Sequence, residues 1–246
     1  MHNLNGKTAI ITGASRGIGA SIAKALAAAG ARVVVNYAQN QIAAHHVISA
    51  IQAEGGEAIA YQADVSQTIE VKALFDTAIQ HFGDVHILVN NAAIMTNHAL
   101  VDTTDADFDQ IFAINVRGVF NTLRESAHRL ASNGRIINLS TTVTRLLLPH
   151  YGAYAASKGA VEQLSRVFAK EIGSRGITVN VVSPGPTHTE LFTHGKSEET
   201  IQRLAAMSAF GRIAEPEDIA RVVVFLASDE AAWVTGQNIG ANGGFA

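Results

Sequence analysis

Residues 8–19 read Thr8-Ala9-Ile10-Ile11-Thr12-Gly13-Ala14-Ser15-Arg16-Gly17-Ile18-Gly19. The first four residues form a short, continuous apolar run, which is typical of a buried strand. Three glycines then occur in the turn at residues 13–19. An alanine-rich stretch with helical spacing follows, and Gly30 stands after it, where a helix C-terminal cap would be. The segment therefore predicts a strand, a tight glycine turn and a helix.

The same alternation of short apolar runs and helical stretches continues along the chain. Further strands are expected at 32–35, 58–62, 87–89, 136–139, 178–182 and 238–239. Helices are expected at 18–29, 42–54, 67–82 with Ser66 as N-cap, 105–116 continuing to 131, 154–173 and 215–227. Continuous apolar strands separated by helices predict a parallel sheet that is covered on both faces. The predicted fold class is α/β, a Rossmann-type doubly wound parallel sheet in three layers, α/β/α.

The composition limits the class of protein. The 246 residues are 48% hydrophobic and only 16% charged, with a net charge of −3, which is unlike a disordered chain or a nucleic-acid-binding protein. No apolar run approaches the ~20 residues of a membrane-spanning helix. The length leaves one or two domains open. Because the chain has only 4 prolines and lacks a linker of biased composition, we expect a single domain over residues 1–246.

The chain contains no cysteine. This excludes disulfides, thiolate nucleophiles and cysteine zinc sites, and it makes the reducing cytoplasm the expected compartment. The histidines show no metal-ligand spacing, so no metal site is expected.

The glycine turn predicts a nucleotide site. Ligands of doubly wound sheets bind beyond the carboxyl ends of the strands. Gly13, Gly17 and Gly19 allow the backbone to approach a pyrophosphate, and the N–H groups of the following helix would face it. The spacing is G-x-x-x-G-x-G, and an ordinary strand-to-helix turn is the alternative.

The end of the second strand bears on which dinucleotide would bind. An acidic residue there would bind the adenosine ribose and exclude a 2′-phosphate, but the chain has Asn36-Tyr37. Arg16 can meet that phosphate, so NADP(H) is favoured over NAD(H). The alternative is that Arg16 is solvated and that the site discriminates only loosely between NADP(H) and NAD(H). Asp64 could accept a hydrogen bond from the adenine amino group or could cap the next helix.

Tyr154 and Lys158 are four residues apart on one predicted helix, so they share a face. A phenol with a pKa of ~10 is a poor base at neutral pH. An adjacent ammonium favours the phenolate and can lower that pKa by ~1–3 units. The pair could then act as the general acid/base that interconverts an alcohol and a carbonyl.

Several segments together resemble the short-chain dehydrogenase/reductase family over essentially the whole chain. They are the glycine turn, Asn90-Asn91-Ala92, Asn115, the segment from Tyr154 to Lys158, and Pro184-Gly185. The resemblance implies that Tyr154 exchanges the proton while nicotinamide exchanges the hydride. It implies that Lys158 lowers the phenol pKa and binds the nicotinamide ribose, and that Asn115 holds a water that links the lysine to solvent.

The family's carbonyl-polarising serine has no exact counterpart here. Thirteen residues before Tyr154 stands Thr141, with Ser140 beside it. A threonine donates the same hydroxyl hydrogen bond, although its methyl group stiffens the side chain and narrows the pocket. We expect Thr141 to take this role, with Ser140 as the alternative.

The resemblance also assigns the cofactor contacts. Two are departures from the family pattern, because Ala93 stands where glycine is usual and Thr187 where an apolar residue usually packs on nicotinamide. The implied contacts are Gly13, Ser15, Arg16, Gly17, Ile18, Gly19, Asn36, Tyr37, Asp64, Val65, Asn91, Ala92, Ala93, Tyr154, Lys158, Pro184, Gly185, Thr187 and Thr189.

The implied function is that of an NADP(H)-dependent oxidoreductase, a carbonyl reductase or alcohol dehydrogenase, acting on a small carbonyl or secondary alcohol. The segment 187–210 is expected to cover the substrate, with Tyr151 and Phe192 among the residues bordering it. By resemblance the helix from Tyr154 and its predecessor pair across subunits, commonly as a homotetramer. No nucleic-acid or membrane partner is expected.

Two alternatives stay open. The segment Ser174-Arg175-Gly176-Ile177-Thr178-Val179-Asn180 also resembles 3-oxoacyl-acyl-carrier-protein reductase. That enzyme docks an acidic carrier on basic residues, and Arg175 matches one such position, whereas residues 131–134 carry no charge. The second alternative is a non-catalytic dinucleotide sensor, which would have no reason to retain Tyr154, Lys158 and Asn115.

Overall fold

One parallel sheet runs through the computed structural model, which describes residues 3–246. Its seven strands lie in the order β3-β2-β1-β4-β5-β6-β7, and every neighbouring pair is parallel. The order reverses between β1 and β4, so the expected doubly wound topology is confirmed. The strands are β1 (Thr8–Ile11), β2 (Arg32–Tyr37), β3 (Ala58–Gln62), β4 (Val85–Asn90), β5 (Leu130–Leu139), β6 (Thr178–Pro184) and β7 (Asn238–Ala241).

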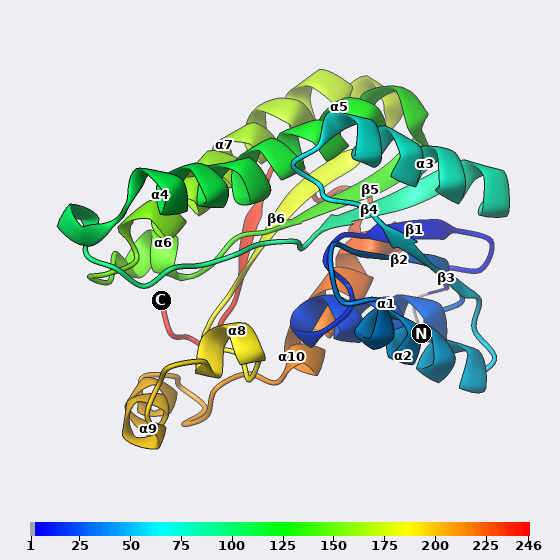
Figure 1. Cartoon of the computed structure of the whole chain (residues 1–246). Coiled ribbons are helices and arrows are strands. Elements are labelled where there is room, and N and C mark those ends of the chain that lie inside the picture. The colour runs from blue at the N-terminus through cyan, green and yellow to red at the C-terminus, as the bar shows by residue number, and fades with distance from the viewer. Residues whose placement is uncertain (1–2) are drawn as a thin grey trace.

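Helices cover both faces of this sheet (Figure 1). On one face lie α1 (Gly17–Ala28), α2 (Gln41–Ala53) and α10 (Pro216–Ala227); on the other lie α3 (Thr68–Phe82), α4 (Asp105–Phe112), α5 (Gly118–Arg129) and α7 (Gly152–Ile172). The arrangement is the predicted three-layer α/β/α fold. Among the described residues, no helix combines the length and apolarity needed to cross a membrane.

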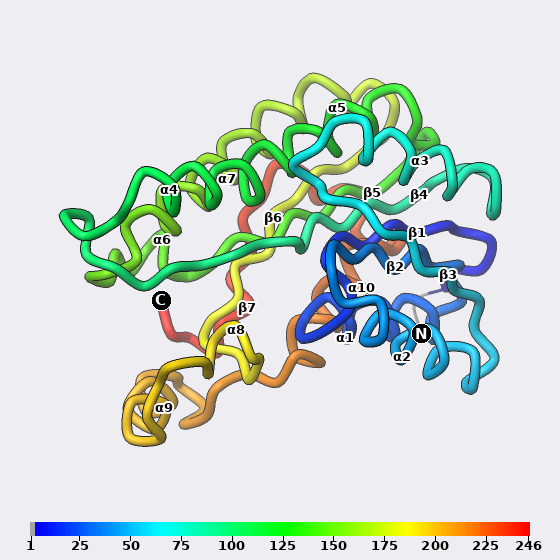
Figure 2. Tube along the Cα trace, viewed as in Figure 1, coloured from blue at the N-terminus to red at the C-terminus, as the bar shows by residue number. Residues whose placement is uncertain are grey.

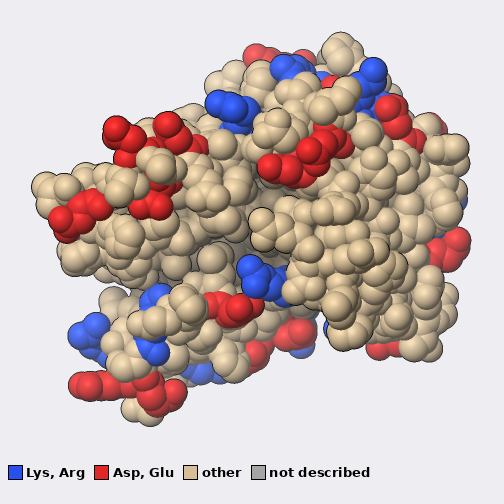
Figure 3. Space-filling model, in the orientation of Figure 1, with Lys and Arg blue, Asp and Glu red and all other residues tan. Residues whose placement is uncertain are grey.

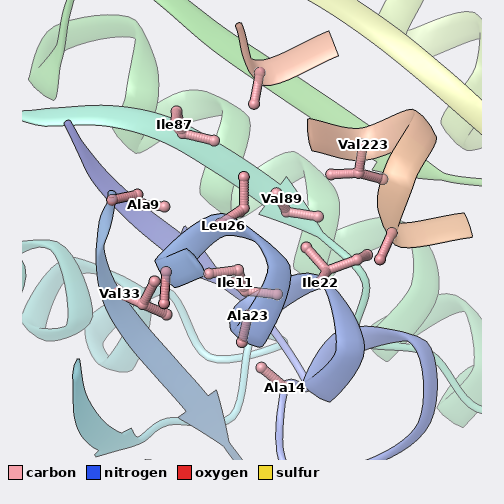
Figure 4. Close-up of a cluster of buried hydrophobic side chains, with 14 of the residues drawn as sticks. Ala9, Ile11, Ala14, Ile22, Ala23, Leu26, Val33, Ile87, Val89 and Val223 are labelled. Carbon is pink, nitrogen blue, oxygen red and sulfur yellow. The ribbon is translucent and has the colours of Figure 1, made fainter. Parts of the chain in front are cut away.

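Two apolar cores hold the layers together, one on each side of the sheet. Figure 4 shows the first, where Ile22 and Leu26 of α1 and Val223 of α10 point at Ile11 and Val89 of the central strands. All five side chains are fully buried or nearly so. Since β1 and β4 are covered on both faces, their uninterrupted apolar runs are explained. This packing fixes the carboxyl ends of the central strands, where the site lies.

Several boundaries differ from the sequence-based expectation. The two helices expected at 105–116 and onward to 131 correspond to α4 and α5. A π-helical turn, η2 (Ala113–Arg117), joins them, and α5 ends at Arg129, before β5 begins at Leu130. The prediction of Ser66 as an N-cap was wrong: α3 begins at Thr68 with Gln67 as its cap residue. The reason is that Asp64 Oδ1 accepts from the Ser66 N–H at 2.9 Å and forms the turn before the helix.

Short elements that the sequence did not reveal surround the carboxyl edge of the sheet. They are α6 (Val143–Leu146), α8 (Glu190–Thr193) and α9 (Glu198–Ala206), with single 3₁₀ turns η1 (Leu100–Asp102), η3 (Gly173–Arg175) and η4 (Asp229–Ala231). In Figure 2, α8 and α9 form a lobe on the opposite side of the carboxyl edge from α4 and α6. The space-filling view in Figure 3 shows the surface hollowed between these two sides. The segment expected to cover the substrate therefore contains the α8–α9 lobe.

Candidate active site

The glycine turn after β1 is pressed against the turn after β4. Gly13 and Gly17 have φ values of +61° and +55°, in the left-handed region that favours glycine. A Cβ on Gly13 would lie 2.8 Å from Ala92 Cα, and one on Gly19 would lie 2.4 Å from Asn91 Nδ2. Asn91 Nδ2 in turn donates to the carbonyls of Thr12 and Gly13 at 3.0 and 2.9 Å. The glycines are therefore required for the close approach of the two turns.

This turn forms one wall of a cleft of about 610 Å³. The glycine turn and the start of α1 can present backbone N–H groups to this cleft, and such groups bind a pyrophosphate. The expected cofactor contacts that line the cleft are Gly13, Ser15, Arg16, Gly17, Ile18, Asn36, Tyr37, Asp64, Val65, Asn91, Ala92, Ala93 and Thr189. Five more line the adjoining cavity: Tyr154, Lys158, Pro184, Gly185 and Thr187. Gly19 lines neither the cleft nor the cavity.

Asn36 holds the end of β2 in place. Its Nδ2 donates to the carbonyls of Ala63 and Tyr61 at 3.0 and 3.3 Å, and its Oδ1 accepts from the Gly13 N–H at 3.2 Å. The side chain is buried, so its amide serves the turn and not an exposed ligand contact. No carboxylate takes the place of Asn36 at this strand end.

Arg16 is exposed at the rim of the cleft, but it is not simply solvated. Its Nη1 lies 2.6 Å from Glu190 Oε2 on α8, so an ion pair bridges the glycine turn and the α8–α9 lobe. Asp64 also lines the cleft, and its carboxylate receives the Ser66 N–H that begins the turn into α3. The alternative that Asp64 caps α3 was wrong, because Gln67 is the cap residue and Asp64 holds the turn before it. The adenine contact stays a prediction.

Tyr154 and Lys158 lie side by side on the buried face of α7. The Tyr154 hydroxyl is hydrogen-bonded to the side chain of Thr141, which follows β5. Lys158 Nζ donates to the Leu139 carbonyl at 2.8 Å and lies 5.9 Å from the centre of the Tyr154 ring. The structure therefore brings together Thr141, Tyr154 and Lys158, as the spacing predicted.

Ser140 faces a different partner. Its Oγ donates to Glu162 Oε1 at 2.7 Å, and Thr144 Oγ1 lies 2.8 Å from the same oxygen. Glu162 is two helical turns after Tyr154 on α7, so it ties the segment after β5 to the helix that carries the tyrosine. Sequence reasoning missed Glu162, although its position eight residues after Tyr154 and four after Lys158 places it on the same face.

Asn115 lies in the π-helical turn and is fully buried. Its Oδ1 accepts from the Ile94 N–H at 2.9 Å, and its Nδ2 donates to the Ile94 carbonyl at 2.9 Å and to Ser157 Oγ at 3.0 Å. The amide therefore joins the segment after β4 to α7. Interruptions of this kind in a helix often occur at functional sites. The expected water-holding role of Asn115 stays a prediction.

The charge states differ from the sequence-based expectation. Burial raises the pKa of Tyr154 to about 12, against the opposing effect of its hydrogen bond with Thr141. Burial lowers the pKa of Lys158 to about 8. Desolvation dominates the shift of the Tyr154 pKa, and the Lys158 ammonium is directed to the Leu139 carbonyl. The expected lowering of the phenol pKa by Lys158 stays a prediction. At neutral pH the Tyr154 phenol is protonated and can donate.

A cavity of about 150 Å³ opens in front of Tyr154. Its walls are mostly apolar, and Tyr151 and Phe192 line it as expected. His194 lines the outer mouth with Arg16 and Lys196, whereas His188 lies 3.6 Å from Glu215 on the exposed surface. The cavity and the dinucleotide cleft share five lining residues, so the two spaces adjoin each other. These residues are Ile18, Asn91, Ala93, Thr189 and Leu191.

Comparison with known proteins agrees with this geometry. A family model described as enoyl-(acyl carrier protein) reductase matches residues 13–246. An uncharacterised oxidoreductase of Methylorubrum extorquens is 47% identical, and the match covers 99% of each chain. The NADPH-dependent aldehyde reductase 2, chloroplastic, of Arabidopsis thaliana is 46% identical, with 98% of this chain and 94% of that one covered.

Solved structures give the same result. The angucycline C-6 ketoreductase LanV with bound NADP superposes with a TM-score of 0.94 at 41% identity, over 99% of this chain and 97% of that one. The chain belongs to the short-chain dehydrogenase/reductase family. A short-chain dehydrogenase/reductase from Serratia marcescens, 38% identical with a TM-score of 0.94 over 99% of both chains, shares the fold as well. As a short-chain dehydrogenase/reductase, the protein is an oxidoreductase of carbonyl and alcohol groups.

Proposed function

We propose that the protein is an NADP(H)-dependent carbonyl reductase that works reversibly as a secondary-alcohol dehydrogenase, with Tyr154 as general acid/base. The observation that carries this proposal is the place of the Tyr154–Thr141 pair, in the wall of the apolar cavity that adjoins the dinucleotide cleft. A carbonyl group in that cavity would lie within reach of both hydroxyls. The arrangement suits proton transfer to a carbonyl oxygen.

Each residue then has a defined task. Thr141 orients the carbonyl oxygen by a hydrogen bond, and Tyr154 donates its phenolic proton to that oxygen as the alcohol forms. The nicotinamide ring, when bound in the cleft, supplies the hydride to the carbonyl carbon. Lys158 stands below the tyrosine as a buried cation, held by the Leu139 carbonyl. In the reverse direction, the phenolate would take the proton of the alcohol.

Support for NADP(H) comes from the rim of the cleft. Arg16 offers a guanidinium at the glycine turn, and β2 ends without the carboxylate that would repel a 2′-phosphate. One relative is named an NADPH-dependent aldehyde reductase, and a similar structure holds NADP. These observations favour NADP(H) over NAD(H) for this chain.

The carrier-protein alternative has less support. The Arg175 guanidinium donates to the carbonyls of Ala127 and Leu130 at the amino end of β5, on the opposite edge of the sheet from the cavity. At the mouth, α4 carries Asp105, Asp107 and Asp109, and Figure 3 shows acidic side chains gathered over this part of the surface. An acidic carrier would be repelled there. The sensor alternative does not account for the assembled Thr141–Tyr154–Lys158 group.

The experiment that tests the proposal follows NADPH oxidation by the purified protein with a panel of simple aldehydes and cyclic ketones. NADH with the same panel is the matched control, and the product alcohol is identified in each case. We expect turnover with NADPH that exceeds turnover with NADH. An absence of turnover with either nucleotide, or a clear preference for NADH, would overturn the corresponding part of the proposal.

A further inference from the structure

The cavity in front of Tyr154 has two apolar walls that come from opposite sides of the opening. One wall consists of Val143, Leu146 and Leu148, on and just after α6. The other wall includes Phe192 of α8 and Leu204 of α9, and Figure 1 places these helices across the opening from α6. Two apolar walls on opposite sides of a cavity fit a molecule with two apolar faces, that is, a flat and largely apolar one.

The same cavity offers almost no charge. Of the described residues that line it, Lys158 is the one with an ionisable charge near neutral pH, and its Nζ is already bound to the Leu139 carbonyl. A carboxylate or phosphate on the part of a substrate that meets the apolar walls would have no charged side chain there to pair with, and burial of an unpaired charge is costly. The cavity therefore favours an uncharged substrate.

Most polar side chains around the cavity are already satisfied within the protein. Thr141 and Tyr154 are bonded to each other and form the proposed reaction site. The other polar side chains that line the cavity make hydrogen bonds within the protein. They are those of Asn91, Ser140, Thr142, Lys158, Thr187 and Thr189.

Tyr151 is the exception. It lies at the start of α7, three residues before Tyr154, is half-buried in the cavity wall, and its hydroxyl makes no hydrogen bond to any residue that the structure describes. Desolvation raises the pKa of this phenol, so the hydroxyl remains a neutral donor. A hydroxyl in the wall of a binding cavity that has no partner within the protein is available to a ligand.

We propose that the site takes an uncharged, flat, largely apolar ketone or aldehyde that carries a second oxygen, and that the Tyr151 hydroxyl binds this second oxygen. This inference rests on the proposed carbonyl reductase function and specifies its substrate class. Tyr154 and Thr141 would hold the reacting carbonyl, and Tyr151 would select among apolar carbonyl compounds by one further hydrogen bond. Its loss would lower kcat/KM more for substrates with the second oxygen than for substrates without it.

The test compares 1-tetralone, a flat bicyclic ketone, with its ring-hydroxylated isomers. NADPH-linked kcat/KM is measured for the wild type, for Tyr151→Phe, and for Tyr61→Phe as a matched control on β3, outside both spaces of the site. We expect at least one hydroxylated isomer to be used better than 1-tetralone by about 3- to 10-fold, the effect of one neutral hydrogen bond. Tyr151→Phe should bring the ratio of kcat/KM between that isomer and 1-tetralone to about one, and Tyr61→Phe should keep the wild-type ratio.

Three results would overturn the inference, and each differs from a failure of the proposed function. The first is reduction of simple aldehydes but not of 1-tetralone, because this result would exclude flat ketones as the substrate class. The second is an equal effect of Tyr151→Phe on all the ketones, or no effect on any. The third is a tetralone carboxylate that is reduced as well as 1-tetralone, where we expect a loss of about tenfold or more. If no carbonyl compound is reduced at all, the proposed function itself fails.

Discussion

Thr141 and Ser140 are adjacent hydroxyls with different surroundings. Thr141 meets the Tyr154 phenol, whereas Ser140 donates to Glu162. We expect Thr141→Val to lower kcat by about 10²- to 10³-fold, as the loss of one oxyanion donor does, and Thr141→Ser to retain most of the activity. Ser140→Ala should cost much less. Steady-state kinetics of the three variants measure this, and a larger loss for Ser140→Ala than for Thr141→Val would reverse the assignment.

The charge states of Tyr154 and Lys158 predict the pH dependence of the reduction. Both groups are active in their protonated forms, as phenol and ammonium. Since the pKa of Lys158 is about 8 and that of Tyr154 about 12, the lysine loses its proton first as pH rises. The kcat/KM for reduction should therefore be constant at low pH and fall as pH rises through about 8. A pH profile that increases through this range would contradict the assignment.

The sequence predicted the acid/base residues better than their environment. Tyr154, Lys158 and Asn115 could be found because their spacing is local or matches a family pattern. Glu162 and the free hydroxyl of Tyr151 could not, since a lone glutamate on a helix reads as solvated and an unpaired hydroxyl is visible only in three dimensions. The direction of the Tyr154 pKa was missed because burial depends on the packing of α7 against β5 and β6.

At the scale of single elements, the glycine turn and the start of α1 offer a direct test. A Cβ at Gly19 would lie 2.4 Å from Asn91 Nδ2 and 2.6 Å from the Gly13 carbonyl oxygen. Gly19→Ala must therefore displace the turn, and we expect weaker NADPH binding and a lower unfolding temperature. Gly173→Ala is the control, because its φ is −59° and nothing lies within 4 Å of the new Cβ. NADPH titration gives the affinity of each variant, and thermal unfolding gives its stability. Equal affinity and equal unfolding temperature of the two variants would contradict the proposed role of the glycine turn in binding the pyrophosphate.

The elements differed in how far they could be predicted. The strands were found because buried parallel strands are continuous apolar runs, as in Ile136-Ile137-Asn138-Leu139. The division into two helices near residue 116 was expected, but the π-helical form of Ala113–Arg117 was missed, since a shift in helical hydrogen bonding leaves the apolar period almost unchanged. Helices α8 and α9 were missed because they are short and largely polar, with Glu190, Glu198 and Glu199 in their first turns.

The whole molecule leaves large apolar side chains exposed. Phe120 on α5 and Val167 on α7 are 45% and 56% exposed on the helices that are expected to pair across subunits. Such side chains suit a protein interface. We expect light scattering to give the mass of four chains, and Val167→Glu to reduce it. A mass of one chain for the wild type, at all concentrations, would contradict the predicted homotetramer.

Sheet order and layer arrangement were predictable from the sequence because one pattern, strand then helix, repeats along the chain. The arrangement of the two sides of the opening was not predictable from the sequence. It depends on how α6 and the α8–α9 lobe fold back over the carboxyl edge of the sheet. The substrate cavity is therefore a property of the whole molecule, and the sequence indicated only which segment would cover it.

The central claim is that Tyr154 donates the proton in NADPH-linked reduction of a carbonyl group. The most direct test compares wild type and Tyr154→Phe in two measurements, kcat for the best carbonyl substrate and Kd for NADPH by fluorescence titration. We predict a loss in kcat of about 10²- to 10⁴-fold, the contribution of a positioned acid, with an unchanged Kd. A Tyr154→Phe protein that reduces the carbonyl at the wild-type rate would contradict the account.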